Sequence, residues 1–330
     1  MSKPKPALVG VMFALLAFAI FSTHDVIVKV LGAEFSVFQT LFFAGLFSFI
    51  PVNIMMASDR EVSNFIPRNP GLLLLRSLAS VVSMSAAFYA FSVLPLAEVY
   101  SLIFATPLLI TLLAIPVLGE TIRFRRGIAV LVGLIGVVIV LRPGATDSTL
   151  GHGAALLAAF GGALASILVR KLGRSERTAV LILYPMMVGF ITMSALQPFV
   201  FKAIDLASLL LMALVGFMAL AAQMCIIAAY RNAPASIVAP MQYSQMIWAI
   251  IFGALVFSEY PDMWVMIGSA IIIASGIYIV VREATSNVSE TTPLLRNPSV
   301  RPDAGPTPKP KIHRELNPQD NVVPDMPDNR

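Results

Sequence analysis

The sequence predicts an all-α membrane protein with ten transmembrane helices in two inverted five-helix repeats, followed by a disordered C-terminal tail. Three observations support this prediction. The 330-residue chain is 58% hydrophobic and only 12% charged, about half the charged fraction of a soluble domain. Its apolar runs reach the roughly 20 residues that a helix needs to cross a bilayer. A pattern of landmark residues also occurs twice along the chain.

The repeated pattern occupies residues 90–142 and 229–282. Each copy opens with an alanine and an aromatic residue, places a glutamate at the same distance after a proline, and closes with a glycine and an arginine. The landmarks are Ala90, Phe91, Pro95, Glu120, Gly136 and Arg142, then Ala229, Tyr230, Pro234, Glu259, Gly276 and Arg282. Because an internal repeat constrains the whole fold, and each copy holds two long apolar runs, the repeat lies in a membrane.

The apolar runs are interpreted as helices, because a backbone in hydrocarbon must satisfy its hydrogen bonds within its own segment. Residues 1–6 are short and basic, and the run that follows is too long for a signal-peptide core. We therefore expect a retained first helix. The expected spans are residues 7–31, 35–57, 71–93, 96–118, 124–142, 151–172, 178–200, 206–231, 235–257 and 262–281.

The spans divide into a first repeat at 7–142 and a second at 151–282. Each repeat has five spans, an odd number, so the second repeat enters the membrane from the opposite side. Such inverted repeats are a common plan for secondary transporters. The first helices support the pairing weakly, because VIVKVLG at 26–32 is similar to ILVRKLG at 167–173.

Basic residues in the loops predict that both termini face the cytoplasm, because cytoplasmic loops carry an excess of Lys and Arg. On that side would lie Lys3, Lys5, Arg60, Arg68, Arg123, Arg125, Arg126, Arg170, Lys171, Arg174, Arg177, Arg231 and Arg282. The opposite side would hold Lys29, Arg142 and Lys202. Residues 283–330 are rich in proline and charge, which predicts a disordered cytoplasmic tail. With one cysteine, Cys225, the chain has no intrachain disulfide.

Three stretches carry a family resemblance: LPLAEVYSLIFATPLLITLLAIPVLGE at 94–120, GVVIVLRPG at 136–144 and QYSQMIWAIIFGALVFSEYPD at 242–262. Over about residues 7–282, the chain resembles the EamA-type transporters of the drug/metabolite transporter superfamily. The resemblance implies that the first, third, fourth, sixth, eighth and ninth helices surround a central cavity, with the fifth and tenth outside. It implies no particular substrate.

Ionisable residues inside a span are costly and are functional candidates by default. His24, Asp25 and Lys29 lie in the outer half of the first span, and Glu98 starts the fourth. Asp25 could bind a proton or cation with His24 nearby. Alternatively, Asp25 pairs with Lys29, four residues away on the same helix face. Glu98 could belong to an entry gate or be a charge at the rim.

Polar and aromatic residues of the fourth, eighth and ninth spans are the substrate-binding candidates. The ninth span supplies Gln242, Tyr243, Gln245 and Trp248, the fourth Tyr100, Phe104 and Thr106, and the eighth Gln223. Amides could orient a polar ligand group and rings could stack on an apolar one; the alternative is hydrogen bonding between helices. Pro107 and Pro240 remove backbone hydrogen bonds, so we expect kinks in both spans.

Two further sets of residues are interpreted as structural. Glu120 and Glu259 lie at opposite membrane faces, where each could accept bonds from the N-terminus of the next helix. In the fifth and tenth spans, small residues four apart predict tight helix packing. These small residues are Ala129, Gly133, Ala270 and Ala274.

Together these features predict a secondary, non-ATP transporter of a small organic metabolite, such as an amino acid, vitamin or nucleotide-like cofactor. It would work by alternating access, with export favoured over import. The alternatives are a drug or cation efflux protein of the same fold and a non-transporting membrane scaffold. An enzyme is disfavoured, since no HExxH, GxxxxGK or nucleophile–base pattern occurs.

The expected partners follow from this interpretation. They are a small-molecule substrate and membrane lipid, with no metal, cofactor or nucleic acid; the sequence leaves open whether transport is coupled to protons or the protein is a facilitator or exchanger. The sequence does not decide between a monomer and a homodimer. We expect a multi-pass protein of the plasma membrane, namely the bacterial inner membrane.

Overall fold

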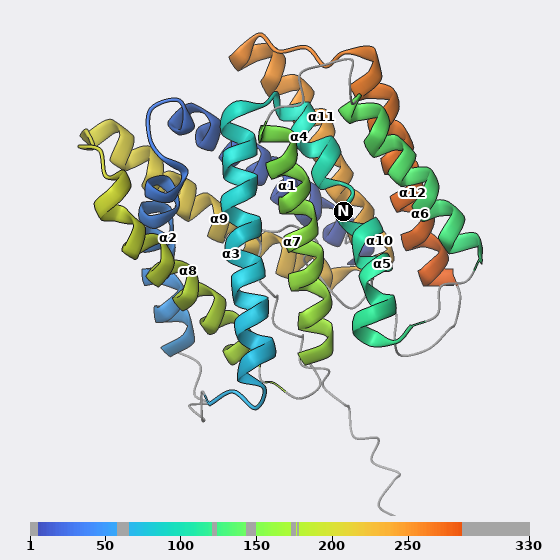
Figure 1. Cartoon of the computed structure of the whole chain (residues 1–330), viewed down its shortest axis with the longest axis horizontal. Coiled ribbons are helices and arrows are strands. Elements are labelled where there is room, and N and C mark those ends of the chain that lie inside the picture. Colours follow the sequence, from blue (N-terminus) through green and yellow to red (C-terminus); the bar gives the residue numbers. More distant parts are fainter. Residues whose placement is uncertain are drawn as a thin grey trace, which may run out of the picture.

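The computed structural model describes residues 6–57, 66–120, 124–142, 150–172, 176 and 178–285, and its regular secondary structure is helical throughout. Figure 1 shows these helices as one bundle. The first repeat contains α1 (Pro6–Gly32), α2 (Val37–Ala57), α3 (Pro70–Val93), α4 (Leu96–Ile103), α5 (Thr106–Leu118) and α6 (Phe124–Leu141). Most of the expected tail lies outside the described residues, although the last helix runs past residue 283 to Thr285.

The second repeat has the same plan with a more divided fourth unit. It contains α7 (Leu150–Leu172), α8 (Thr178–Val200), α9 (Leu206–Asn232), α10 (Ala235–Val238), the 3₁₀ helix η1 (Ala239–Ser244), α11 (Gln245–Phe252), the π-helical turn η2 (Gly253–Phe257) and α12 (Met263–Thr285). Nine helical segments in the described part of the chain are long and apolar enough to cross a membrane, and α2 adds a shorter apolar segment. The all-helical membrane fold is therefore confirmed.

The expected kinks occur as breaks in the helices. Pro107 has no amide hydrogen, so it cannot bond to the Ile103 carbonyl, and α4 ends at Ile103. The Thr106 hydroxyl takes the amide's place and donates to the Ile103 oxygen at 2.6 Å. In the second repeat Pro240 lies near the start of η1, where the chain is wound as a 3₁₀ helix. The fourth and ninth spans are thus both interrupted near a proline.

Helices of the two repeats pack against each other in mirrored pairs. α1 packs on α9 and, in the mirrored position, α3 packs on α7, while α6 packs on its own counterpart α12. Close approaches at glycine repeat this symmetry. A Cβ on Gly10 would lie 2.4 Å from Ala233 Cβ, and a Cβ on Gly151 would lie 2.8 Å from Leu94 Cγ. In the sequence repeat, Gly10 corresponds to Gly151 and Ala233 to Leu94.

The contact between α6 and α12 corrects one prediction. On α6 the expected face is right, because Ala129 and Gly133 are buried and Ser275 donates to the Ala129 carbonyl. On α12 the face is wrong, because Ala270 and Ala274 are exposed. The buried positions are Val265, Gly268, Ser269, Ile272, Ser275, Gly276, Ile279 and Val280. Spacing between small residues does not fix which way a uniformly apolar helix is turned.

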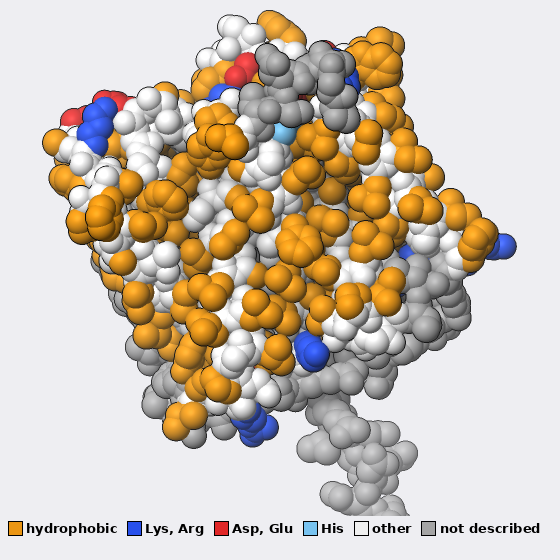
Figure 2. All heavy atoms as spheres, in the orientation of Figure 1, with side chains coloured by type: hydrophobic (Ala, Val, Ile, Leu, Met, Phe, Trp, Pro, Cys, Tyr) orange, Lys and Arg blue, Asp and Glu red, His pale blue; other side chains and the backbone are white. Residues whose placement is uncertain are grey.

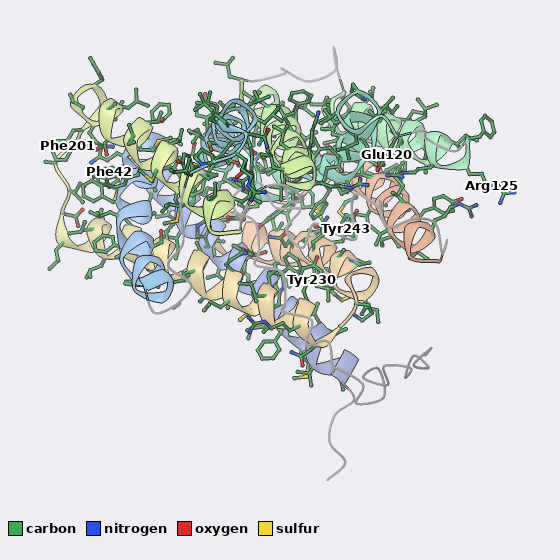
Figure 3. All side chains as sticks on the ribbon, turned by 90° about the horizontal axis from the view of Figure 1, so that it is seen from below. Phe42, Glu120, Arg125, Phe201, Tyr230 and Tyr243 are labelled. Atoms are coloured by element: carbon green, nitrogen blue, oxygen red, sulfur yellow. The ribbon has the colours of Figure 1, made fainter. Side chains whose placement is uncertain are left out.

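The surface of the bundle is that of a membrane protein. Figure 2 shows hydrophobic side chains across the middle of the visible face, with charged side chains mostly near the edges. Exposed apolar residues include Leu131 on α6 and Leu210 on α9, each 62% exposed. Figure 3 shows Glu120 and Arg125 on one side of the bundle and Phe42 and Phe201 on the opposite side. Such apolar exposure is stable when lipid covers it.

The bundle has two ends, each named here by a basic residue. The Lys29 end holds the C-termini of α1, α3 and α6 and the N-termini of α7 and α12, joined by ion pairs such as that of His152 and Glu98. The Arg170 end holds the opposite termini, where Asn69 at the start of α3 bonds to Glu176 after α7. Successive spans therefore alternate in direction, as the inverted repeat requires.

Candidate functional site

A group of buried polar side chains joins the two repeats in the interior of the bundle. We call it the Asp25 cluster: Ser22, His24 and Asp25 of α1, Tyr100 of α4 and Gln245 of α11. Each of these side chains is at most 4% exposed. Four of the five were candidates from the sequence, in the first, fourth and ninth spans, and the structure brings them together. Ser22 was missed, although it lies three residues before Asp25 on the same helix face.

The Asp25 carboxylate receives hydrogen bonds from two helices. The Tyr100 hydroxyl donates to its Oδ2, and His24 Nδ1 lies 2.8 Å from its Oδ1. The Tyr100 oxygen also lies 3.3 Å from Ser22 Oγ and 3.4 Å from Gln245 Nε2. A buried carboxylate is costly unless it is hydrogen-bonded or neutralised. The cluster can therefore hold a carboxylate, a proton on it, or a cation beside it.

Aromatic rings surround the polar groups. Phe91 of α3 meets the Tyr100 ring edge-on, with centroids 5.2 Å apart. Phe104, the C-cap residue of α4, meets Tyr243 of η1 at 5.1 Å in the same geometry, and Figure 3 shows Tyr243 in the interior of the bundle. Ring faces of this kind stack on planar groups and attract cations.

The other candidate residues lie apart from the Asp25 cluster or have local partners. Trp248 is partly exposed and stacks on Phe252, with centroids 5.8 Å apart. Gln242 is also partly exposed, and Thr106 is bonded to Ile103 at the break before α5. Gln223 of α9 has a buried Oε1 with no hydrogen-bond partner among the described residues. Glu98 pairs with His152 Nε2 at 3.3 Å, near the Lys29 end.

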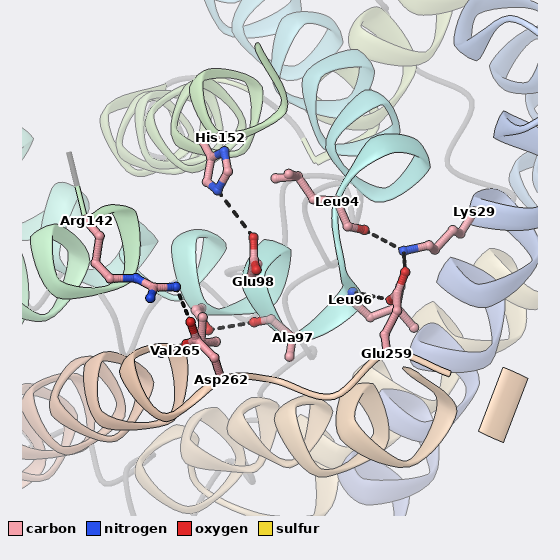
Figure 4. Close-up of polar contacts among 11 residues, drawn as sticks. Lys29, Leu94, Leu96, Ala97, Glu98, Arg142, His152, Glu259, Asp262 and Val265 are labelled. Atoms are coloured by element: carbon pink, nitrogen blue, oxygen red, sulfur yellow. Dashed lines mark hydrogen bonds and ion pairs between the residues drawn. The ribbon is translucent and has the colours of Figure 1, made fainter. Parts of the chain in front are cut away.

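Lys29 departs from the expected pairing with Asp25. Its Nζ lies 2.5 Å from Glu259 Oε1 and donates to the Leu94 carbonyl at 2.6 Å (Figure 4). It also lies over the Phe257 ring. One turn of helix separates Lys29 from Asp25, yet the long lysine side chain extends toward the second repeat. A carboxylate from the far half of the chain, which helix periodicity cannot identify, is its ionic partner.

The expected capping role of Glu259 is also wrong. Its Oε2 accepts from the Leu96 amide at 3.4 Å, so it contacts the N-terminus of α4 rather than that of the next helix, α12. Asp262 accepts the amide of Val265 near the start of α12. The corresponding glutamate, Glu120, forms an ion pair with Arg170. For Glu120, the first residues after it lie outside the described part of the chain.

The Lys29–Glu259 and Arg170–Glu120 pairs are the features that sequence reasoning missed. Their signal was present, because VIVKVLG and ILVRKLG align Lys29 with Arg170 and the repeat aligns Glu120 with Glu259. Each landmark was interpreted within its own repeat, however, whereas each ion pair crosses between repeats.

Comparisons with known proteins identify a family and several relatives that are transporters. The family model described as "EamA-like transporter family" matches residues 8–142 and 149–282. An S-adenosylmethionine uptake transporter of Rickettsia bellii is 26% identical over 83% of this chain and 94% of its own length. The pseudopaline exporter CntI of Pseudomonas aeruginosa is 27% identical over 82% of this chain and 93% of its own.

One solved crystal structure aligns with a TM-score of 0.56 at 15% sequence identity, covering 86% of this chain and 99% of its own. This likeness supports the fold alone. The two relatives carry different substrates in opposite directions, so they agree on transport and differ on cargo.

Proposed function

This chain belongs to the EamA-like transporter family, and from that premise we propose that it moves an amino-acid-derived metabolite with a cationic centre through the Asp25 cluster. The chain is a secondary transporter and a multi-pass membrane protein, in a family of transporters rather than enzymes. Transport would proceed by alternating access, with the cluster exposed first to one side of the membrane and then to the other. We propose export as the net direction, in a bacterial inner membrane with both termini in the cytoplasm.

One observation carries this proposal: the buried Asp25 carboxylate accepts a hydrogen bond from Tyr100, and the Tyr100 hydroxyl in turn lies 3.4 Å from Gln245 Nε2 of the other repeat. A site shared between repeats can change its accessibility when the repeats move relative to each other. The carboxylate would attract a cationic centre, and the rings of Phe104 and Tyr243 would stack on a planar or apolar part. The Gln245 amide would orient a polar group.

The named relatives suggest which compounds to test. S-adenosylmethionine carries a sulfonium, an amino-acid end and an adenine ring, which match a carboxylate, an amide and aromatic faces. The same chemistry also suits a hydrophobic organic cation, so drug efflux is the second candidate. Proton coupling through Asp25 is part of the proposal, because a carboxylate that alternates between bound substrate and bound proton exchanges one for the other.

The test is flux through the purified full chain in proteoliposomes. We expect labelled S-adenosylmethionine, or another compound in a panel of amino acids, nucleosides and organic cations, to cross in both directions, with one direction favoured under an imposed pH gradient. The same compound should raise the unfolding temperature, because it binds the folded state. If no compound in the panel moves or stabilises the protein, this substrate class is wrong.

A further inference from the structure

Two ion pairs tie the repeats together at opposite ends of the bundle. Lys29 on the first helix of repeat one meets Glu259, after the fourth unit of repeat two. Arg170 on the first helix of repeat two meets Glu120, after the fourth unit of repeat one. In the alignment of the two repeats, Lys29 corresponds to Arg170 and Glu259 corresponds to Glu120, so each ion pair is the counterpart of the other. They are one contact, built twice by the inverted repeat.

Their surroundings match as well. The basic side chain is 10% exposed in both pairs, and the glutamate is 25% exposed at Glu259 and 20% at Glu120. An ion pair shielded to this degree is screened less by salt than a surface pair. Removing one partner leaves a partly desolvated charge, so each pair can hold its end of the bundle closed.

The two ends of the bundle differ in the ion pairs that they carry in addition to these two. At the Lys29 end, Glu98 also pairs with His152 and Asp262 pairs with Arg142 (Figure 4). In the sequence repeat, the corresponding positions at the Arg170 end are Ile237 with Val11, and Arg123 with Arg282. Neither combination can form an ion pair. The Lys29 end therefore has two additional closing pairs without counterparts.

Backbone packing shows the same asymmetry. α1 packs against α3, with Gly32 close enough to Ser92 that a Cβ would lie 2.3 Å from the serine Cβ. The mirrored helices, α7 and α9, make at most isolated contacts in the part of the chain that the structure describes. The first and third helices are thus held together in one repeat and separate in the other.

We propose that Lys29–Glu259 and Arg170–Glu120 are the two gates of the transport cycle, that the structure with both pairs formed is the closed state, and that in the ligand-free protein the Arg170 gate opens more often than the Lys29 gate. This inference rests on the proposed alternating access and adds the residues that control it. Opening one end breaks its ion pair while the opposite pair holds. Among the described residues, the Lys29 end carries two further pairs between the repeats, Glu98–His152 and Arg142–Asp262, whose corresponding positions at the Arg170 end cannot pair, so the Arg170 end opens more readily.

Accessibility of a central thiol tests the proposal in the full chain. Cys225, the chain's one cysteine, is replaced by alanine, and Ala105→Cys introduces a reporter at the break between α4 and α5, where Ala105 is 1% exposed. Ser101→Cys, nearly isosteric, is a second reporter if the first variant does not fold. A membrane-impermeant maleimide is applied in turn to each face, using right-side-out and inside-out vesicles.

Without substrate, the reporter should react faster from the Arg170 side. Glu259→Gln should raise the labelling rate from the Lys29 side by roughly tenfold and lower it from the other, since opening one gate favours closing the opposite one. Glu120→Gln should do the reverse. Exchanging the charges, Lys29→Glu with Glu259→Lys, should move the labelling rates back toward the wild-type pattern, although not fully, because the bonds to the Leu94 carbonyl and the Leu96 amide are lost.

The matched control is Glu34→Gln. Glu34 also pairs with a lysine near the Lys29 end, but that pair is more than half exposed and joins the loop after α1 to the one after α8. Its loss should leave both labelling rates unchanged. Unchanged rates in Glu259→Gln, equal acceleration from both sides, or faster wild-type labelling from the Lys29 side would each overturn the proposal.

This experiment is independent of the proposed substrate, because labelling needs no ligand. If the gates respond as expected while no compound moves, the substrate class has failed and the gates stand. If a substrate is transported while the charge variants label like the wild type, the gates have failed and the proposed function stands.

Discussion

Asp25 depends on Tyr100 for one of its hydrogen bonds, although the two residues lie on different helices. Tyr100→Phe removes that donor and keeps the ring in place. We expect a loss of about 1–3 kcal/mol of interaction with the ionised carboxylate and roughly 5- to 150-fold weaker substrate binding. Equilibrium binding to purified protein measures this, with Tyr278→Phe, a 42% exposed tyrosine of α12, as the control. Equal affinities in the two variants would remove Tyr100 from the site.

Gln245 allows a matched test against another buried glutamine. Gln245→Ala removes an amide that contacts Tyr100, whereas Gln39→Ala removes one that is completely buried and bonds to the backbone of Lys202, away from the cluster. Both changes should lower the unfolding temperature, because both leave polar groups without partners. Only Gln245→Ala should also weaken substrate binding. Weaker binding in both variants would mean that loss of stability, rather than loss of contact, is being measured.

At this scale the sequence identified residue types better than their partners. Asp25, Tyr100 and Gln245 were predictable because buried polar groups inside apolar spans are rare and costly. The partner of Lys29 was not, because Glu259 lies 230 residues away in the chain. Spacing along the helix favoured Asp25 as the partner of Lys29, and only the tertiary structure brings Glu259 within reach of the lysine.

At the break between α4 and α5, the Thr106 hydroxyl donates the hydrogen bond that Pro107, which has no amide hydrogen, cannot donate. Thr106→Val should leave the Ile103 carbonyl without the hydroxyl that replaces the missing proline amide, and destabilise the protein by about 1–3 kcal/mol. Thr192→Val is the control, since the Thr192 hydroxyl bonds to Val188, four residues earlier within α8. Thermal unfolding in detergent compares the two. Equal losses of stability in the two variants would show that the Thr106 hydrogen bond contributes no more than an ordinary side-chain bond within a helix.

Element boundaries were largely predictable, and the orientation of each helix about its axis was not. Apolar length located the spans, and Pro107 and Pro240 located the interruptions. The prediction that α12 packs through Ala270 and Ala274 was wrong, because an apolar helix in lipid has no polar side to mark its exterior. The predicted role of Glu259 was wrong because its carboxylate contacts the N-terminus of α4 in the other repeat, rather than that of α12, the next helix in the chain.

The whole molecule has a predicted orientation that can be checked directly. The excess of Lys and Arg near the Arg170 end predicts that this end faces the cytoplasm. A reporter tag inserted within 143–149 should be accessible from outside the cell, and a tag within 173–175 only from inside. Protease protection or tag-specific labelling of intact cells measures both. The reverse pattern would invert the orientation and leave the fold unchanged.

At this scale the inverted repeat was the most informative feature of the sequence. It predicted two similar halves of opposite direction, and the mirrored packing of α1 on α9 and α3 on α7 has that form. The difference between the two ends could not be derived from the repeat, because it arises where the two copies differ: Glu98 corresponds to Ile237, and Asp262 corresponds to Arg123.

Coupling of substrate to protons through Asp25 is the central claim, and one measurement tests it most directly. Substrate uptake is followed in proteoliposomes with and without an imposed pH gradient, for the wild type and Asp25→Asn. Asp205→Asn, which alters the exposed residue before α9, is the control. The wild type and the control should accumulate substrate only with the gradient, while Asp25→Asn should lose accumulation and retain exchange of substrate for substrate. Gradient-driven accumulation by Asp25→Asn, or a wild type indifferent to the gradient, would contradict the account.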